Sequence, residues 1–292
     1  MSNIVYRIVY FLIRLAGLLP LGVLYFISDL ICYLIYHVIR YRRQVVNENL
    51  RNSFPEKSAS EIRNIAKKYY RHLSDLIVEG LYLPGMGEKE ISMRVRYNNP
   101  ELIQKYFDRG KNVAAVFGHY GNWEWLCGFP LITQYKCITI YRPLKNKIFD
   151  RLLLAVRSRF GVEPVPMKMV IRKIFEYDKL GVPSITAFIA DQTPPMEKYI
   201  FWVDFFNQDT PVYSGVERIA KKMDMAVIFF KMKKTRRGYY EFDLIPLFDN
   251  ASETVDYEIT KTHVAFLEQQ IREKPEYWLW SHRRWKLKRN ML

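Results

Sequence analysis

The stretch 113-VAAVFGHYGNWEWL-126 decides the fold, because an apolar run ends there at a glycine, a histidine and a short polar turn. The run 113–117 has the length and composition of a fully buried strand. Gly118 and Gly121 give the backbone freedom for a turn, and Asn122 is a residue type that commonly begins a helix. We therefore predict a strand, a loop and a helix in this stretch.

From residue 94 onward, further apolar strands alternate with helices. Candidate strands lie at 113–117, 137–141, 184–190, 225–230 and 239–247, and candidate helices at 99–109, 122–132, 146–160, 168–180, 213–223 and 256–273. Apolar strands separated by helices are typical of a mainly parallel sheet covered on both faces. The last two strands, joined through the basic run 231–238, predict an antiparallel edge. This run is most simply a solvated turn, and docking of an acidic protein or of lipid headgroups is the alternative. The predicted fold class is α/β, with a mixed, mainly parallel sheet flanked by helices.

The N-terminal segment differs in character from the rest of the chain. Residues 18–39 are predominantly apolar over about the 20 residues that a helix needs to cross a bilayer. The basic cluster 40–44 follows, as at the cytoplasmic end of many membrane helices. The preceding stretch 4–17 carries two arginines close to one face, which predicts an interfacial helix. We expect residues 1–43 to form a membrane anchor and residues 44–292 the globular domain; a buried helical hairpin is the alternative.

The charge of the chain narrows the choice of partners. Its 292 residues carry a formal net charge of +15, which favours nucleic acid, anionic lipid, a phosphorylated substrate or an acidic protein. Nucleic acid is disfavoured, because the basic residues are scattered and no nucleic-acid-binding motif is found in the sequence. The three cysteines have no metal-ligand spacing, so we expect no metal. The sequence contains no Walker loop and no dinucleotide-binding glycine motif, so nucleotide chemistry is not indicated.

His119 and Glu124 are the first candidate for a catalytic pair. On one continuous helix their side chains would point about 140° apart, so they can meet only across a turn that leads into a helix. A carboxylate beside an imidazole fixes its tautomer and raises its basicity, which suits a general base acting on a hydroxyl or an amine. Spacing alone leaves open that His119 is only a structural hydrogen-bonding residue at the end of a strand.

Three candidate polar residues follow apolar strands, namely His119, Arg142 and Asp191. Active sites in open α/β sheets lie at the carboxyl ends of the strands, so we expect these three at one edge. Asp191 needs a partner, because a lone carboxylate at the end of a buried strand is costly. Asn146 and Arg159, which belong to the helix predicted at 146–160, are further candidates with equally plausible structural roles.

The segment 118-GHYGNWEW-125 resembles the His-x4-Asp/Glu motif of the glycerolipid and lipid A acyltransferase superfamily. Within it, the chain is most similar to the late acyltransferases of lipid A biosynthesis, the lauroyl and myristoyl transferases. The segments that carry this likeness, in the family's order, are 141-YRPLKNKIFD-150, 190-ADQTP-194, 204-DFFNQDTPVYSG-215 and 276-EYWLWSHRRWK-286. One departure is Gln192, where better-known members of the family carry a histidine.

The resemblance implies a membrane-bound enzyme that moves a fatty acyl chain from acyl carrier protein to a hydroxyl of a lipid A precursor. It implies action on the cytoplasmic face of a bacterial inner membrane. No cofactor is expected beyond the phosphopantetheine of the acyl carrier protein, because its thioester is already activated. Residues 44–292 would form the acyltransferase domain, with His119 as general base and Glu124 as the carboxylate that orients it. A glycerophospholipid or an aminolipid acceptor is the alternative.

The remaining candidates are assigned to substrate binding. We expect Arg142 to bind a phosphate or to polarise the acyl carbonyl. The backbone around Asn122, at a helix N-terminus, would donate to the tetrahedral oxyanion. Arg283, in a tail rich in tryptophan and arginine, would contact the membrane or a substrate phosphate. The full set of predicted substrate-binding residues is Asn122, Arg142, Asn146, Arg159, Asp191 and Arg283. The expected partners are acyl carrier protein, a phosphorylated lipid acceptor and the membrane, without nucleic acid.

Overall fold

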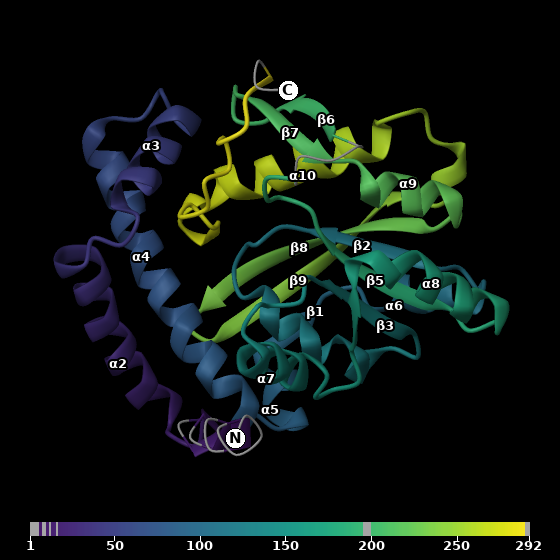
Figure 1. Cartoon of the computed structure of the whole chain (residues 1–292), viewed down its shortest axis with the longest axis horizontal. Helices are drawn as coiled ribbons and strands as arrows, with labels where there is room; N and C mark the ends of the chain where they lie inside the picture. The colour runs from purple at the N-terminus through teal and green to yellow at the C-terminus, as the bar shows by residue number, and fades with distance from the viewer. Residues whose placement is uncertain (1–5, 8–9, 12, 16, 195–199, 290–292) are drawn as a thin grey trace.

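A seven-stranded sheet forms the centre of the molecule (Figure 1), with strand order β1-β9-β8-β2-β5-β3-β4. The computed structural model describes residues 6–7, 10–11, 13–15, 17–194 and 200–289. Neighbouring strands of this sheet are parallel except for the pair β8 and β9, which is antiparallel. The predicted mixed, mainly parallel sheet flanked by helices is therefore confirmed.

The strands of the main sheet are β1 (Val95–Tyr97), β2 (Val113–Phe117), β3 (Lys136–Tyr141), β4 (Glu163–Pro166), β5 (Ser184–Ile189), β8 (Ala226–Arg236) and β9 (Tyr239–Phe248). Two further strands, β6 (Ile200–Asp204) and β7 (Asp209–Tyr213), form a separate antiparallel pair. The helices are α2 (Leu21–Tyr33), α3 (Arg43–Ser53), α4 (Ala59–Tyr82), α5 (Glu88–Arg94), α6 (Glu101–Asp108), α7 (Lys147–Arg157), α8 (Val170–Lys179), α9 (Gly215–Lys222) and α10 (Glu258–Glu273).

All five strands expected from the sequence are present, and β2 coincides with the expected range 113–117. Every residue of β2 is buried, because β5 and β8 pair with its two edges while helices cover the sheet. The segment expected as a helix at 122–132 is instead a 3-10 helix, η3 (Trp123–Ile132), with Pro130 inside it. A proline removes a backbone donor and disfavours a regular α-helix at that point. The short strands β1, β4, β6 and β7 were not expected from the sequence.

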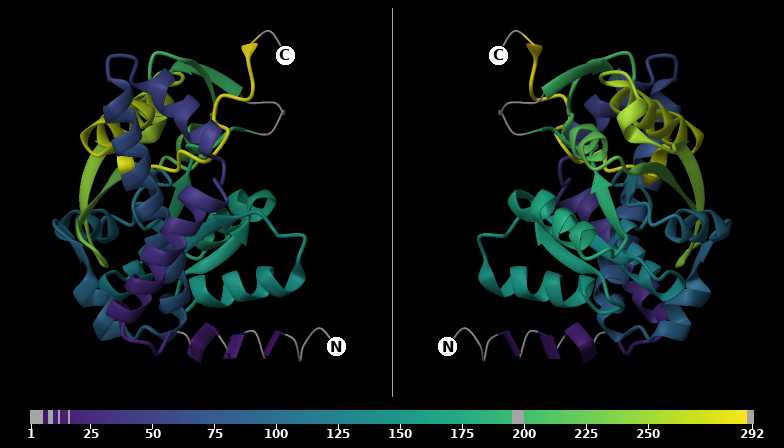
Figure 2. Two further views of the ribbon diagram at one scale, coloured as in Figure 1. Left: turned by 90° about the vertical axis from the view of Figure 1, so that its left-hand side faces the viewer. Right: turned by 90° about the vertical axis from the view of Figure 1, so that its right-hand side faces the viewer.

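The helix α2 lies beside the long helix α4, as two directions of view show (Figures 1 and 2). Leu21 and Leu24 of α2 are buried against Val78 of α4. The outward side of α2 exposes large apolar residues, including Phe26 and Leu30. The α-helix continues as a π-helical turn, and Leu21–Val38 as a whole is long and apolar enough to cross a membrane. The expected interfacial helix at 4–17 lies partly outside the described residues.

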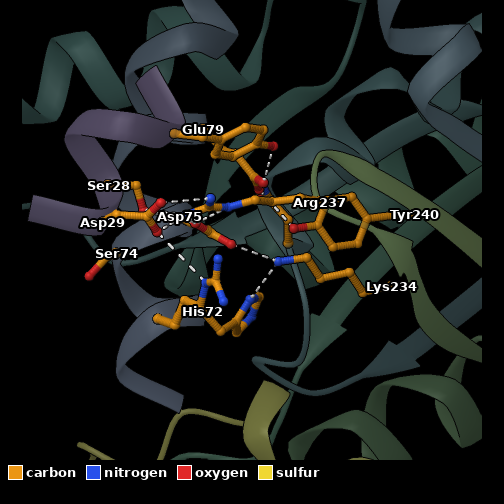
Figure 3. Close-up of polar contacts among 12 residues, drawn as sticks. Ser28, Asp29, His72, Ser74, Asp75, Glu79, Lys234, Arg237 and Tyr240 are labelled. Atoms are coloured by element: carbon orange, nitrogen blue, oxygen red, sulfur yellow. Dashed lines mark hydrogen bonds and ion pairs between the residues drawn. The ribbon is translucent and has the colours of Figure 1, made fainter. Parts of the chain in front are cut away.

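A buried polar cluster fixes α2 to the domain (Figure 3). Asp75 of α4 accepts a hydrogen bond of 2.8 Å from Ser28 of α2. Lys234 and Arg237 of the β8–β9 hairpin reach the same carboxylate at 3.0 and 2.6 Å, and Arg237 also pairs with Asp29 of α2. The expectation of a solvated turn at 231–238 is wrong, because β8 continues to Arg236 and these cations face the buried Asp75. The cluster therefore joins α2, α4 and the hairpin into one unit.

Candidate active site

Two adjacent strands bring a histidine and an aspartate together. Strands β2 and β5 are parallel and pair Phe117 with Ile189, so His119 and Asp191 each stand two residues beyond that pair. The distance from His119 Nδ1 to Asp191 Oδ1 is 2.6 Å, and the backbone N–H of His119 donates to Asp191 Oδ2 at 2.8 Å. Arg142 follows β3, the next strand of the sheet, so the three predicted strand-end residues share one edge.

The hydrogen bonds of His119 define its tautomer. An ionised carboxylate only accepts hydrogen bonds, so Nδ1 carries the proton that faces Asp191. On the other side of the ring, the amide Nε2 of Gln192 lies 3.2 Å from His119 Nε2 and donates to it. Trp123 packs against the ring with an edge-on geometry at 4.9 Å between centroids. His119 therefore presents an unprotonated Nε2, the atom that a general base requires.

Asp191 is held as a buried carboxylate. Its side chain is 2% exposed, and its Oδ2 also accepts a hydrogen bond of 2.8 Å from Trp278 Nε1. Burial on its own would raise the pKa of Asp191, but the charge of His119 and the hydrogen bonds from His119 and Trp278 outweigh it and lower the pKa to about 2. Asp191 is therefore ionised at neutral pH and can stabilise a positive charge on the imidazole.

Two glycines allow the loop after β2 to approach this carboxylate. A Cβ atom at Gly118 would lie 2.7 Å from a methyl carbon of Leu267 and 3.1 Å from Asp191 Oδ2. Gly121 has a φ of +58°, and a Cβ atom there would lie 2.2 Å from the sulfur of Met232. A larger residue at Gly118 would have to displace the side chain of Leu267, and one at Gly121 would in addition be strained by the positive φ. The turn suggested by the two glycines is therefore present, and the backbone conformation at Gly121 favours glycine.

The carboxylate of Glu124 binds Arg157 and not His119, the partner expected from the sequence. Its carboxylate forms a two-point ion pair with Arg157 of α7, at 2.8 and 2.5 Å. Among the described residues, the carboxylate bound to the His119 ring belongs to Asp191 and not to Glu124. The expected contact between His119 and Glu124 was therefore wrong, because the carboxylate that binds His119 is that of Asp191. The physical reason is that the matched register of β2 and β5 delivers Asp191 to the ring, while the guanidinium of Arg157 offers Glu124 two parallel hydrogen bonds.

A cavity of about 610 Å³ opens beside His119. This volume is within the range of about 300–1,000 Å³ that small-molecule sites occupy. Its walls come from β2, β3, β5, η3, α7 and α9, and are mostly aliphatic and aromatic. The polar or charged side chains in its lining include His119, Glu124, Arg142, Arg157 and Gln192. The cavity therefore has the composition expected of a site for a long apolar group with a reactive polar end.

Of the six predicted substrate-binding residues, Arg142 lines this cavity, and the other five, Asp191 included, do not. Asn122 is buried and donates to Glu79 at 2.6 Å, while Asn146 caps α7 by accepting from two backbone N–H groups of its first turn. Arg159 donates to backbone carbonyls at the end of α4, including that of Met86 at 2.7 Å. Arg283 is exposed in the C-terminal segment. The observed contacts of Asn122, Asn146 and Arg159 are structural.

The structure adds residues that the sequence did not single out. Trp278 supports Asp191 from a position 87 residues away, and Arg157 pairs with Glu124 across 33 residues. His282 accepts a hydrogen bond of 3.1 Å from the backbone of Thr193, directly after the Asp191 segment. The signal for Trp278 and His282 was the Trp- and Arg-rich tail itself, but no local pattern tells which of its side chains turn inward.

The sequence matches the family of bacterial lipid A biosynthesis acyltransferases over residues 2–287. No individually curated protein matches the chain. The family match contains both members of the His119–Asp191 pair, all residues that line the cavity, and the tail that carries Trp278. The chain belongs to the family of bacterial lipid A biosynthesis acyltransferases.

Proposed function

We propose that this protein transfers a fatty acyl chain from the thioester of acyl carrier protein to a hydroxyl of a lipid A precursor. The observation that carries this proposal is the position of His119. Its Nδ1 is bound to the ionised Asp191, and the ring lines an apolar cavity large enough for a small-molecule ligand. The family match supports a lipid acceptor, and the thioester donor and the roles of the residues belong to the proposal.

The reaction begins when the acceptor hydroxyl replaces Gln192 at His119 Nε2. His119 takes the hydroxyl proton as the oxygen attacks the thioester carbonyl, which forms a carbon–oxygen bond and a tetrahedral oxyanion. Collapse of this intermediate breaks the carbon–sulfur bond, and His119 returns the proton to the phosphopantetheine thiolate. Asp191 stays ionised throughout and stabilises the imidazolium that exists between the two proton transfers.

Two of the backbone N–H groups first expected to bind the oxyanion, those of Gly121 and Asn122, already have partners. The N–H of Gly121 donates to the carbonyl of Tyr277 at 3.0 Å, and the N–H of Asn122 donates to the sulfur of Met232 at 3.1 Å. We therefore assign the developing negative charge, or a phosphate of the acceptor, to Arg142 at the cavity wall.

Glu124 and Arg157 act as a pair in this scheme. Both side chains line the cavity, and each satisfies the charge of the other. We assign Glu124 to positioning Arg157 at the cavity wall, so that its effect on the reaction is indirect. A bidentate carboxylate contact restricts a guanidinium more than a single hydrogen bond does. This role replaces the direct support of His119 that the sequence suggested.

The proposal includes attachment to the cytoplasmic face of the bacterial inner membrane, with residues 1–43 as anchor and 44–292 as the acyltransferase domain. The exposed apolar side of α2 and the basic cluster that follows it support this placement. Leu144, Met167 and Ile171 are exposed and also line the cavity, so the rim of the site has an apolar part. A lipid acceptor can then reach His119 without leaving an apolar surface.

The test is a transfer assay in detergent with acyl carrier protein thioesters of several chain lengths. The acceptors are a tetra-acylated lipid A precursor, a lysophospholipid and an aminolipid. Wild type should acylate the lipid A precursor, and His119→Ala should lose about 10²- to 10⁴-fold in rate, the usual contribution of a general base. Lys288→Met, an exposed change in the tail, is the control and should keep wild-type activity. Transfer to lysophospholipid alone would refute the acceptor, and near-normal turnover by His119→Ala would refute the mechanism.

A further inference from the structure

A second, much smaller cavity touches Asp191. Its volume is about 10 Å³, close to the lower limit of about 10–15 Å³ for one water molecule. His119 does not line it, although Phe117 and Ala190 line both this cavity and the proposed acyl cavity. Its walls are largely apolar, with side chains such as Phe117, Phe229 and Leu267, and its polar side chains are Asp191, His263 and Arg284.

Two of these polar side chains have atoms without a partner among the described residues. Arg284 is 1% exposed, and its Nη2 donates to the carbonyl of Pro211 at 2.8 Å. Its Nε and Nη1 make no hydrogen bond in the described part of the chain, and the same holds for Nε2 of His263, which is 5% exposed. An unsatisfied buried polar group costs about 1–3 kcal/mol, more when it is charged, so three such atoms on side chains that line one cavity call for a ligand.

The charges around the cavity select the ligand. Arg284 can only donate hydrogen bonds and the ionised Asp191 can only accept them, while His263 has one nitrogen of each kind when neutral. Burial lowers the pKa of His263 to about 4 and that of Arg284 to about 10, so at neutral pH the first is neutral and the second is charged. An anion in the cavity would be repelled by the Asp191 carboxylate, and a cation would be repelled by Arg284. A neutral molecule that both donates and accepts hydrogen bonds can satisfy all three side chains.

We propose that this cavity binds one water molecule, which accepts from Arg284 and donates to Asp191 or His263, and that Arg284 is thereby a positioning residue of the His119–Asp191 pair. The water connects the Asp191 carboxylate to the buried guanidinium of Arg284 through hydrogen bonds. The functional part of this inference rests on the proposed transferase mechanism. The water site itself does not depend on that mechanism.

The charge of Arg284 affects how readily the His119–Asp191 pair takes up a proton. The charged and titratable groups around it are His263 on α10, His282 and Arg284 in the C-terminal segment, and Glu124, Arg142 and Arg157 at the cavity wall. Of these, Arg284 is the buried cation beside Asp191. Loss of its charge would favour protonation of the pair and reduce the fraction of enzyme with a free base at a given pH.

The first experiment uses the unmodified full chain. A crystal structure at a resolution that shows ordered water should contain one water within hydrogen-bonding distance of Arg284 Nε or Nη1, His263 Nε2 and Asp191. Crystals soaked in bromide should show no anomalous peak at this position. A bromide peak, or side chains that close the cavity by direct contact, would overturn the water site whatever the activity of the enzyme.

The second experiment measures kcat/KM against pH for three variants. Arg284→Met should lower kcat about tenfold with little change in KM and shift the acidic limb to higher pH by about half a unit or more, the effect of losing one charged hydrogen-bonding partner. Arg284→Lys, which keeps the charge, should retain the position of the limb. Lys288→Met should match wild type in all respects.

A purely structural Arg284 would lower the folded fraction without moving the pH profile. An unchanged acidic limb in folded Arg284→Met would therefore overturn the positioning role. Should that variant fail to fold, the comparison of Arg284→Lys with wild type decides. A single ammonium cannot place donors at the positions of both Nε and Nη1, so kcat should fall while the acidic limb stays in place, and a wild-type kcat would overturn the role. An inactive wild type would refute the proposed transferase function and leave the crystallographic result standing.

Discussion

Asn122 donates a hydrogen bond of 2.6 Å to the buried carboxylate of Glu79, and this bond ties the loop after His119 to the long helix α4. Glu79 also accepts from Tyr25 of α2 and Tyr240 of β9, each at 2.8 Å. One carboxylate therefore connects the N-terminal helix, the central helix, the β8–β9 hairpin and the active-site loop. Burial raises the pKa of Glu79, although these hydrogen bonds and Lys234 act in the opposite direction.

The first prediction concerns the stability that Glu79 provides. Glu79→Ala leaves the buried donors of Asn122 and Tyr240 and the half-buried hydroxyl of Tyr25 without their acceptor, so we expect a loss of about 3 kcal/mol or more in the free energy of unfolding. The measurement is urea denaturation followed by tryptophan fluorescence. Glu48→Ala, an exposed change on α3, is the control and should stay within about 0.5 kcal/mol of wild type. Equal values for the two variants would show that the Glu79 contacts contribute nothing net.

The second prediction separates the two carboxylates of the site. Asp191→Asn removes the acceptor that fixes the His119 tautomer, so we expect kcat/KM to fall by about 10²- to 10⁴-fold. Glu124→Gln loses part of an ion pair with Arg157 and should cost about tenfold or less. The measurement is the initial rate of transfer from an acyl carrier protein thioester, with thermal unfolding to confirm that both variants are folded. A larger loss in Glu124→Gln than in Asp191→Asn would restore Glu124 as the orienting residue.

Much of the architecture could be predicted because it depends on local pattern. The apolar strands, their helical connections and the placement of His119, Arg142 and Asp191 at strand ends follow from residue type and periodicity. The capping box of α4 is also local, since Ser58 and Glu61 are three residues apart. Such features require no knowledge of which distant segments meet.

The partner of His119 could not be predicted from spacing, because 72 residues separate it from Asp191 and the contact depends on the register of β2 and β5. Glu124 is the carboxylate nearer to His119 in sequence, but it forms an ion pair with Arg157 instead. The same limit explains the hairpin, where a basic run looks solvated until Asp75 of α4 is placed beside Lys234. Long-range ion pairs are decided by packing, which single-sequence patterns do not contain.

The third prediction concerns pH. Burial lowers the pKa of His263 from 6.5 to about 4 in the folded protein. In the unfolded chain this histidine binds a proton near its ordinary pKa, so the folded state loses stability as pH falls from about 6.5 to about 4 and is unaffected above that window. The contribution at stake is about 3 kcal/mol. Unfolding free energies measured across this range should fall less steeply for His263→Gln than for wild type. Parallel curves would show that His263 is not held neutral.

The fourth prediction tests the attachment of α2 through Asp75. This carboxylate is 3% exposed in its side chain and is shared by Lys234 and Arg237. Asp75→Asn leaves two cations without their buried counter-charge, and breaking a buried pair in this way costs about 3–5 kcal/mol. Because Ser28 also loses a charged acceptor, α2 should separate from α4 more readily. Unfolding free energy and the rate of proteolytic cleavage before residue 44 report the two effects.

A matched control is available in Asp256, which pairs with Lys221 at 2.9 Å but is 88% exposed in its side chain. Exposed pairs contribute about 0–1 kcal/mol, so Asp256→Asn should change neither measurement appreciably. The contrast isolates burial, because both substitutions remove one carboxylate charge from an aspartate–lysine pair. A similar small effect in both variants would mean that water reaches Asp75 and that the polar cluster does not hold α2. A large effect in Asp75→Asn alone would show that this buried carboxylate secures the N-terminal helix to the domain.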